Sequence, residues 1–362
     1  GDLFVKPFYT KLLKALNMVP IFRLKDGGFQ KLTKNYETFD FCFEALHENK
    51  TIMILAEGST KHEKRLRPLR KGTARIAFGT YDKYGDIGLQ IIPVGVNYSY
   101  ADQARSDVMI EFGEPILLKD YISTYEREPN RAMREVLETL DERLRKIIII
   151  IDEKSDEWLF EQSLILYRNN HPEKVLPVVV SSNRRLQDER RIAKHFNKLP
   201  EEQKQPLKER VRQYLKKLED KEITDRGLVQ PQYGNWNYSI MLIIGFLPFV
   251  LAFISNFIPF AIARYVKKTK VRHIEFKLSV WLAVAMFLYL LYWIGWLIVA
   301  AFINHWAFWA WAIVLPFWAF YVPVYYETYR RWKEARAAAR HSEEERQDLM
   351  RQRAVVMEAL KI

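Results

Sequence analysis

The sequence predicts an α/β domain, with a mixed sheet flanked by helices, followed by a helical region and by C-terminal transmembrane helices. Two observations predict this order. Segments with helical spacing alternate with strand-like runs over residues 1–120, which is typical of mixed α/β layers. Three long apolar segments lie within residues 238–325, and each reaches the roughly 20 residues that a bilayer crossing needs.

The first elements are read from periodicity and turn residues. Phe4–Met18 has apolar residues at helical spacing, with lysines off the apolar stripe, and predicts a helix. Val19–Phe22 predicts a short strand with Arg23 at its end. Asn35–Glu48 predicts an amphipathic helix.

The stretch Thr51–Phe78 organises the chain. Ile52–Ala56 predicts a buried strand that ends at an acidic turn, and a helix is expected from Gly72. Ligands of α/β proteins bind where strand ends meet helix N-termini, so this corner suits a phosphate-bearing substrate with hydroxyls. A capping turn followed by a solvated basic loop is the alternative. The turn is Glu57-Gly58-Ser59-Thr60, and the loop carries Lys61, Lys64, Arg65, Arg67, Arg70 and Lys71.

Two further strands complete the predicted domain over residues 1–120. Ile87–Tyr98 predicts a buried strand with Pro93 at or near its end. Val108–Phe112 predicts another, stopped by a Gly-Glu-Pro turn. Residues 121–237 are charged and helical in pattern and predict a helical extension that ends in a linker.

The membrane region at 238–325 holds three apolar segments, Tyr238–Ala263, Leu278–Ile303 and Trp306–Tyr325. Only Asn304 and His305 separate the second segment from the third. The last two segments are therefore expected to form a tight hairpin.

Basic flanks set the expected topology. Arg264–Lys277 and Glu327–Arg340 are rich in Lys and Arg, and such flanks tend to stay in the cytoplasm. Both ends of the first apolar segment then lie on one side. Pro248 and Pro259 inside it favour a re-entrant or broken helical hairpin over a simple crossing. Residues 326–362 alternate in charge and predict a solvated helical tail.

Composition narrows the class of partner. The 362 residues carry 56 Lys and Arg against 44 Asp and Glu, a formal charge of +12, which favours phosphate, nucleic acid or anionic lipid. No recognised nucleic-acid module is present, so no nucleic-acid partner is expected. The single cysteine, Cys42, excludes an intramolecular disulfide framework and lies mid-helix between two phenylalanines, which indicates a core residue.

Leu55–Lys61 and Leu66–Ala74 carry a family resemblance. They read LAEGSTK and LRPLRKGTA, and they resemble the third sequence block of the glycerolipid acyltransferases, which include glycerol-3-phosphate and lysophosphatidic acid acyltransferases. That block reads Phe-Pro-Glu-Gly-Thr-Arg-Ser, with Leu-Pro-Lys-Lys-Gly shortly after. The family's phosphate-contacting arginine falls at Thr60, and a nearby cation such as Lys61 could replace it.

Two more blocks of the family appear in the same order. Val19–Arg23 is similar to the second block, and Ile91–Val96 is similar to the fourth. The resemblance covers about residues 1–120. It implies that the substrate is bound by Arg23, Glu57, Gly58, Ser59, Thr60, Lys61 and Pro93.

The family's first block, His-x-x-x-x-Asp, supplies the catalytic base. Each of the seven histidines lacks an aspartate five residues later. The catalytic His and Asp are therefore expected upstream of Gly1, the chain is expected to lack its N-terminal part, and residues 1–362 alone are expected to be inactive. A true pseudoenzyme is the competing interpretation.

The resemblance implies a function in phospholipid biosynthesis. The expected enzyme is a membrane-bound acyltransferase that moves a fatty acyl group from acyl-CoA or acyl-ACP to glycerol 3-phosphate or 1-acylglycerol 3-phosphate. Its expected partners are membrane lipids, the acyl donor as co-substrate and the phosphate-bearing glycerol acceptor, with no cofactor and no metal. The catalytic domain is expected to face the cytoplasm. The alternative is an inactive homologue that serves as a lipid-binding or membrane scaffold.

Overall fold

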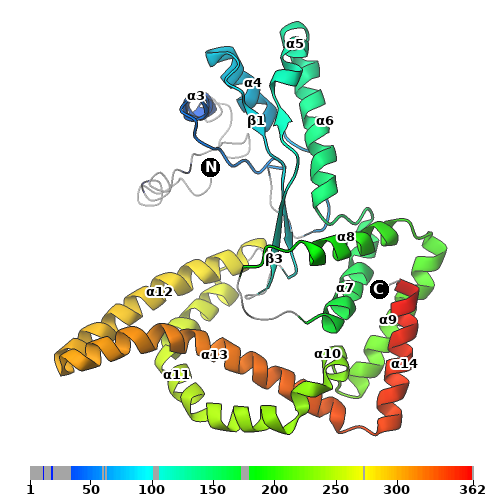
Figure 1. Ribbon diagram of the computed structural model, residues 1–362, viewed down its shortest axis with the longest axis vertical. Coiled ribbons are helices and arrows are strands. Elements are labelled where there is room, and N and C mark those ends of the chain that lie inside the picture. Colours follow the sequence, from blue (N-terminus) through cyan, green and yellow to red (C-terminus); the bar gives the residue numbers. More distant parts are fainter. Residues whose placement is uncertain are drawn as a thin grey trace. The chain divides into compact units, whose positions relative to one another are not determined.

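A computed structural model describes residues 11, 18, 34–58, 61, 63–100, 106–172, 179–271 and 274–360 (Figure 1). The expected strand Val19–Phe22 and nearly all of the expected helix Phe4–Met18 lie outside these residues. The chain divides into two compact units, which are described separately. The first comprises residues 1–60, 66–97 and 109–148, and the second comprises residues 61–65, 98–108 and 149–362.

Helices α3 and α4 confirm two sequence predictions in the first unit. They pack closely because α4 carries Gly79 at the contact, where an added Cβ would lie 2.4 Å from Cζ of Phe43. The described elements around this unit are α3 (Lys34–His47), α4 (Gly72–Tyr84), β1 (Gln90–Ile91), β2 (Val94–Tyr98), β3 (Val108–Phe112), β4 (Ile116–Leu117), α5 (Lys119–Arg127) and α6 (Pro129–Ile147).

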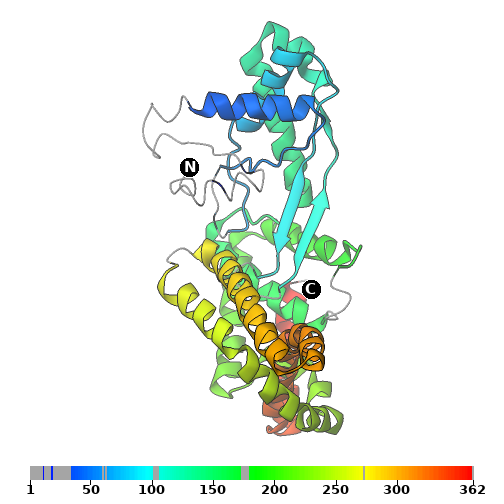
Figure 2. The same ribbon diagram turned by 90° about the vertical axis from the view of Figure 1, so that its left-hand side faces the viewer.

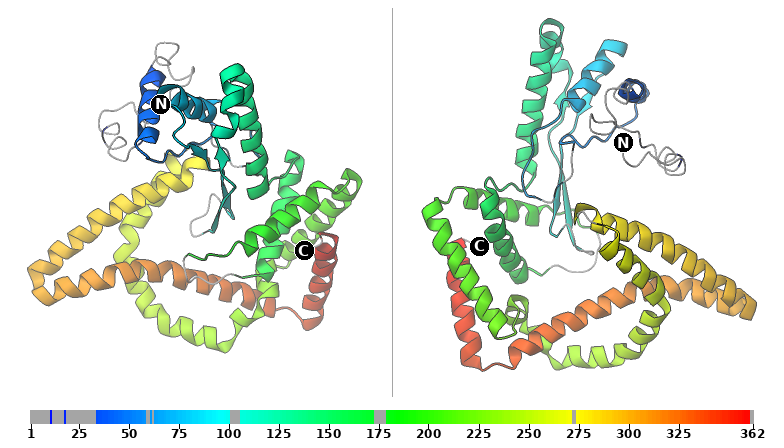
Figure 3. Two further views of the ribbon diagram at one scale, coloured as in Figure 1. Left: turned by 45° about the horizontal axis from the view of Figure 1, so that its top comes forward. Right: turned by 180° about the vertical axis from the view of Figure 1, so that it is seen from behind.

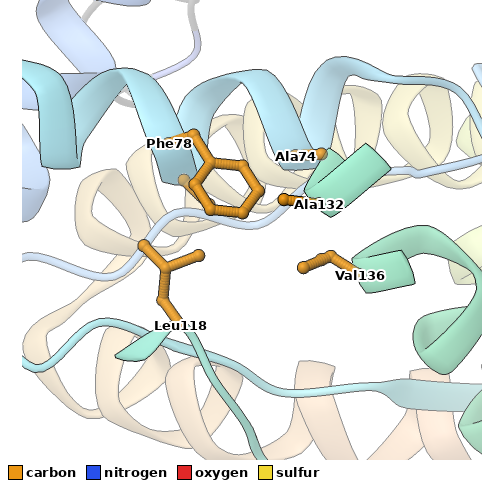
Figure 4. Packing of buried hydrophobic residues seen from close by; sticks show 6 residues of the cluster. Ala74, Phe78, Leu118, Ala132 and Val136 are labelled. Atoms are coloured by element: carbon orange, nitrogen blue, oxygen red, sulfur yellow. The ribbon is translucent and has the colours of Figure 1, made fainter. Parts of the chain in front are cut away.

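The core of this unit lies between α4 and α6. Phe78 of α4 is buried against Leu118, Ala132 and Val136 (Figure 4), and its ring stacks on Tyr125 of α5 with 4.1 Å between ring centroids. Burying one such side chain contributes about 1.5–3 kcal/mol. Helices α5 and α6 complete this core, and the unit runs to residue 148.

The described strands form two small antiparallel pairs in place of the predicted mixed sheet. In one pair, Gln90 of β1 lies opposite Leu117 of β4. In the other, β2 and β3 lie side by side (Figure 2), and hydrogen bonds from Ser99 N to Asp107 O and from Gly113 N to Pro93 O fix an antiparallel register.

Two predicted strands need correction. The strand expected over Ile87–Tyr98 is split, because Pro93 stands between β1 and β2 and has no N–H to donate to a ladder. Ile52–Ala56 forms no strand in the described part of the chain. Met53 and Leu55 remain 88% and 74% exposed. The segment therefore has the alternating side-chain pattern of a strand, but in the described part of the chain no neighbouring strand pairs with it. A strand over Val108–Phe112 is confirmed by β3, but Val108, Ile110 and Phe112 are exposed, so it is not the buried strand that was expected.

The second unit is helical from residue 154 onward in the described part of the chain. The helical pattern predicted from residue 121 begins in the first unit, with α5 and α6. Three of its helices, α11, α12 and α13, are long and apolar enough to cross a membrane by length and composition. Its elements are η3 (Lys154–Asp156), α7 (Glu157–Asn170), α8 (Arg184–Asn197), α9 (Glu201–Asp220), α10 (Asp225–Val229), η4 (Pro231–Gly234), α11 (Trp236–Thr269), α12 (Ile274–Ile303), α13 (His305–Ala339) and α14 (Glu343–Leu360).

Helix α14 is packed, which differs from the solvated tail that the charge pattern predicts. Leu349, Val356 and Leu360 are buried. Arg353 is buried with them and its Nε lies 2.7 Å from Oδ1 of Asp225 in α10. Arg353, one of the charged residues that predicted a solvated helix, therefore anchors α14 through a buried ion pair with Asp225.

Candidate functional site

The acidic turn is built by Glu57 and Gly58. The N–H of Gly58 donates to the carbonyl of Leu55 at 3.0 Å, which closes the turn. Gly58 has φ +66°, a left-handed conformation that costs a side-chain-bearing residue about 1–2 kcal/mol. Glycine at this position therefore lets the chain reverse directly after the acid.

The downstream loop folds back onto this turn. The N–H of Arg70 donates to the carbonyl of Ala56 at 2.8 Å, and the N–H of Arg67 donates to Oε2 of Glu57 at 3.1 Å. The carboxylate of Glu57 thus binds the backbone of the loop that carries the cations. No hydrogen bond to its second oxygen, Oε1, is found within the described residues.

Arg70 lies across the turn. A Cβ on Gly58 would sit 3.1 Å from Cγ and 3.8 Å from Nε of Arg70. The guanidinium group of Arg70 therefore stands beside the Glu57-Gly58 turn, and Arg70 is exposed. A guanidinium group binds phosphate through two parallel N–H donors, so this arginine is a candidate phosphate ligand.

The N-terminus of α4 follows directly. Its N-cap residue, Lys71, makes no side-chain cap, and its first turn carries no acid. Uncapped N–H groups and the helix dipole favour anions at such an end. Oγ1 of Thr73 is buried and has no hydrogen-bond partner among the residues that the structure describes. Arg70, Lys71 and the first turn of α4 thus present positive charge beside the Glu57 carboxylate.

Two cations of the predicted loop are used in packing. Within the second unit, Nζ of Lys64 lies 3.2 Å from Oε1 of Glu161, and Nε of Arg65 lies 3.3 Å from Oε1 of Glu157. Both acids belong to α7. The positive charge that the sequence places in this loop is therefore partly neutralised.

The structure describes four of the predicted site residues. Glu57 and Gly58 share the turn, whereas Arg23, Ser59 and Thr60 lie outside the described residues. Lys61 is exposed and belongs to the second unit. Pro93 is buried and packs 3.4 Å from the position that a Cβ on Gly113 would take.

The sequence names Arg70 only as one of six cations in the loop of a corner that suits a phosphate-bearing substrate, without distinguishing it from the others. It stood within the Leu66–Ala74 segment that resembles the family, and its place beside Glu57 depends on the left-handed turn at Gly58. The glycine after an acid was the available signal, because it marks a point where the backbone reverses.

Cys42 is a core residue, in line with its mid-helix position. It is buried in α3, and this burial raises the pKa of its thiol. Among the residues that the structure describes, no three His, Cys, Asp or Glu side chains gather as they would around a metal ion.

A family model described as Acyltransferase matches residues 2–97, which contain the turn, the loop and α4. Glycerol-3-phosphate O-acyltransferase 1 of Saccharomyces cerevisiae is 33% identical over 148 residues, covering 40% of this chain and 20% of the relative. The chain carries an acyltransferase domain. The Glu57 corner thus lies within an acyltransferase domain.

Two other relatives extend this acyltransferase match. Glycerol-3-phosphate O-acyltransferase 2 of S. cerevisiae is 26% identical over 235 residues, 62% of this chain and 29% of the relative. An uncharacterised acyltransferase of Schizosaccharomyces pombe is 29% identical over 137 residues, 37% of this chain and 20% of the relative. The matches span between a fifth and a third of the length of these relatives. No solved structure matches the chain.

Proposed function

We propose that this acyltransferase transfers a fatty acyl group from an acyl thioester, acyl-CoA or acyl-ACP, to glycerol 3-phosphate or 1-acylglycerol 3-phosphate. The observation that carries the proposal is the turn in which Glu57 binds the loop backbone while Arg70 lies across Gly58. It supports a corner with one carboxylate for a hydroxyl and cations for a phosphate, inside the region that matches the acyltransferase family model.

The acceptor is proposed to bind in a fixed orientation. Arg70, Lys71 and the first turn of α4 hold its phosphate, and Glu57 accepts a hydrogen bond from one of its hydroxyls. In glycerol 3-phosphate, which has two hydroxyls, the phosphate and one hydroxyl are then fixed and the other hydroxyl is placed for attack. In 1-acylglycerol 3-phosphate the single free hydroxyl is the attacking group, and Glu57 orients it. Such positioning supplies much of the rate of an intermolecular reaction. Arg23, which follows the second family block, is proposed as a further phosphate ligand.

The reaction forms one ester bond and breaks one thioester bond. The acceptor oxygen attacks the thioester carbonyl, an oxyanion forms and needs aimed N–H donors, and the C–S bond then breaks. A general base takes the hydroxyl proton, which finally reaches the leaving thiolate. None of the seven histidines has the family's spacing to aspartate, so the roles proposed for these residues are binding and positioning.

The apolar helices suit a lipid product. A glycerol phosphate that gains an acyl chain partitions into the bilayer, and α11, α12 and α13 supply long apolar surfaces. We propose that the protein acts at the membrane, with its acyltransferase domain on the cytoplasmic side.

The test is acyl incorporation by membranes that contain the native protein. The membranes receive radiolabelled glycerol 3-phosphate or 1-acylglycerol 3-phosphate together with either acyl-CoA or acyl-ACP. The expected result is a labelled lipid one acyl chain heavier than its acceptor, above the level in membranes without the protein. No incorporation with any pairing of donor and acceptor contradicts the proposal and favours an inactive lipid-binding homologue.

A further inference from the structure

Both ends of the membrane region pack against the same short helices. The guanidinium group of Arg226 in α10 binds both carboxylate oxygens of Glu334 in α13, at 2.6 and 2.8 Å. A Cβ on Gly227 would lie 2.3 Å from the carbonyl oxygen of Glu334, so the two backbones touch. Helix α11 begins at Trp236, directly after η4. The start of α11 and the end of α13 therefore lie on one side of the membrane.

This arrangement restricts the number of crossings. Three full crossings by α11, α12 and α13 would leave the start of α11 and the end of α13 on opposite sides of the bilayer. Only an even number returns the chain to its starting side. One of the three apolar helices therefore does not cross.

The contacts of the first half of α11 show it running into the membrane along α13. Trp332 donates to Oγ of Ser239, Tyr325 to the carbonyl of Leu242, and Tyr321 to the carbonyl of Gly245, each at 2.9 Å. As α11 proceeds from Ser239 to Gly245, it contacts residues of α13 that lie progressively earlier in the chain. The first half of α11 therefore moves toward the turn that joins α12 and α13 at Asn304.

The second half of α11 moves back along α12. The hydroxyl of Tyr289 donates to the carbonyl of Asn256 at 3.3 Å, and later in the helix Lys267 lies over the ring of Trp281 at 5.9 Å. The second half of α11 therefore contacts residues of α12 that lie progressively earlier in the chain, and it runs away from the turn at Asn304. Tyr289 stands about 15 residues from that turn, or roughly 22 Å at 1.5 Å per residue, so this contact lies near the middle of the hairpin.

The chemistry of α11 explains how it reverses. Pro248 and Pro259 lie inside the helix, and a proline removes one backbone hydrogen bond and kinks a helix. Between them, Oγ of Ser255 and Nδ2 of Asn256 donate to the carbonyl of Ala252 at 3.1 and 2.8 Å. Figures 1 and 3 show α11 as a strongly bent helix, whereas α12 and α13 extend as a hairpin.

We infer that α11 is a re-entrant helix that enters and leaves the bilayer on the side of α7–α10, and that α12 and α13 alone cross it. The returning end of α11 carries exposed Arg264, Lys268 and Lys270, for which the described residues offer no ion-pair partner. Cations at this depth contact the headgroups of anionic lipids. The partner of this surface is thus the leaflet that faces the soluble helices.

Cysteine labelling in sealed vesicles tests the topology. Single cysteines replace Trp236, Lys270, Asn304 and Val355 in a Cys42→Ser background, and a membrane-impermeant maleimide is added before or after permeabilisation. We expect the cysteines at 236, 270 and 355 to behave alike, so that all three react before permeabilisation or all three react only after it. The cysteine at 304 should show the opposite behaviour. Opposite behaviour at 236 and 270 overturns the inference, as does labelling of 304 together with 236.

Limited trypsin digestion gives a second readout without any substitution. In vesicles where trypsin cuts at the exposed Arg184, at the start of α8, it should also cut between residues 264 and 277, which leaves α12 and most of α13 as a protected fragment. Protection of residues 264–277 in the same vesicles would place the end of α11 on the far side, and the inference would then be wrong.

Discussion

The backbone N–H of Arg67 donates a hydrogen bond to Oε2 of Glu57, ten residues earlier in the chain, at 3.1 Å. This contact gives Glu57 a structural task as well as its proposed task at the acceptor hydroxyl. The loop that it holds brings Arg70 across Gly58. Removing the carboxylate therefore disturbs the cations as well as the acid.

Glu57→Gln and Glu57→Ala separate these two tasks. The amide oxygen of glutamine still accepts a hydrogen bond from Arg67, so Glu57→Gln keeps the loop in place and loses only the charge. A hydrogen bond to a charged group contributes about 1.5–3 kcal/mol, so we expect Glu57→Ala to lower kcat/KM by about 10- to 100-fold and Glu57→Gln to lower it less. Equal losses in acyl-transfer assays would show that loop anchoring is irrelevant.

Gly58→Ala tests the left-handed turn. Alanine at φ +66° should destabilise the domain by about 1–2 kcal/mol, and its Cβ would press on Cγ of Arg70. Gly72→Ala is the matched control, because a Cβ there meets nothing within 4 Å and alanine favours a helix. Thermal unfolding should show a lower Tm for Gly58→Ala and no loss for Gly72→Ala.

Arg353→Met tests the anchoring of α14. Arg353 and Asp225 are each 5% exposed at the side chain, and the hydroxyl of Tyr214 donates to the same carboxylate at 2.6 Å. Removing one partner of a buried pair costs about 3–5 kcal/mol. We expect Arg353→Met to release α14 to proteolysis, whereas Arg351→Met, at an exposed position of the same helix, should leave it protected. Equal protection of the two variants would contradict the anchoring role.

Tyr125 makes the domain sensitive to alkali. Burial, with a hydrogen bond to Asp82 at 2.8 Å, raises the pKa of Tyr125 to about 12 from its ordinary value of 10.0. A raised pKa contributes stability that is present below pH 10 and is lost as the pH rises through 12. Tyr125→Phe should therefore lose less stability than the wild type between these pH values, whereas Tyr36→Phe, at an exposed ring, should follow the wild type.

Local periodicity predicted much of the fold. The spacing of apolar residues within one segment was enough to predict α3, α4, β3 and the three apolar segments. Long-range pairing was not available from such patterns. Ile52–Ala56 has the alternation of a strand, but a strand also needs a partner ladder, and Pro93 interrupts the ladder that Ile87–Tyr98 was expected to form.

The sequence predicted the acidic turn of the corner, whereas only the structure shows which loop cation lies beside that turn. Glu57 and Gly58 share the turn because they are adjacent in the chain. Arg70 comes beside them only through the positive φ of Gly58 and the hydrogen bond from Arg70 N to Ala56 O, neither of which a residue spacing encodes. In the same way, the charge pattern of α14 predicted a solvated helix, because Arg353 looks like any other surface arginine until Asp225 is placed next to it.

The most direct test of the central claim is the KM for glycerol 3-phosphate in Arg70→Ala, measured beside Arg127→Ala. Arg127 is an exposed arginine at the end of α5, and its Nε donates only to the carbonyl of Ser123 among the described residues. If the Glu57 corner binds the acceptor phosphate, Arg70→Ala should raise this KM by about 10-fold or more, the loss of roughly 1.5–3 kcal/mol from a charged hydrogen bond, while the KM for the acyl donor and the kinetics of Arg127→Ala stay unchanged. An unchanged acceptor KM in Arg70→Ala would contradict the account.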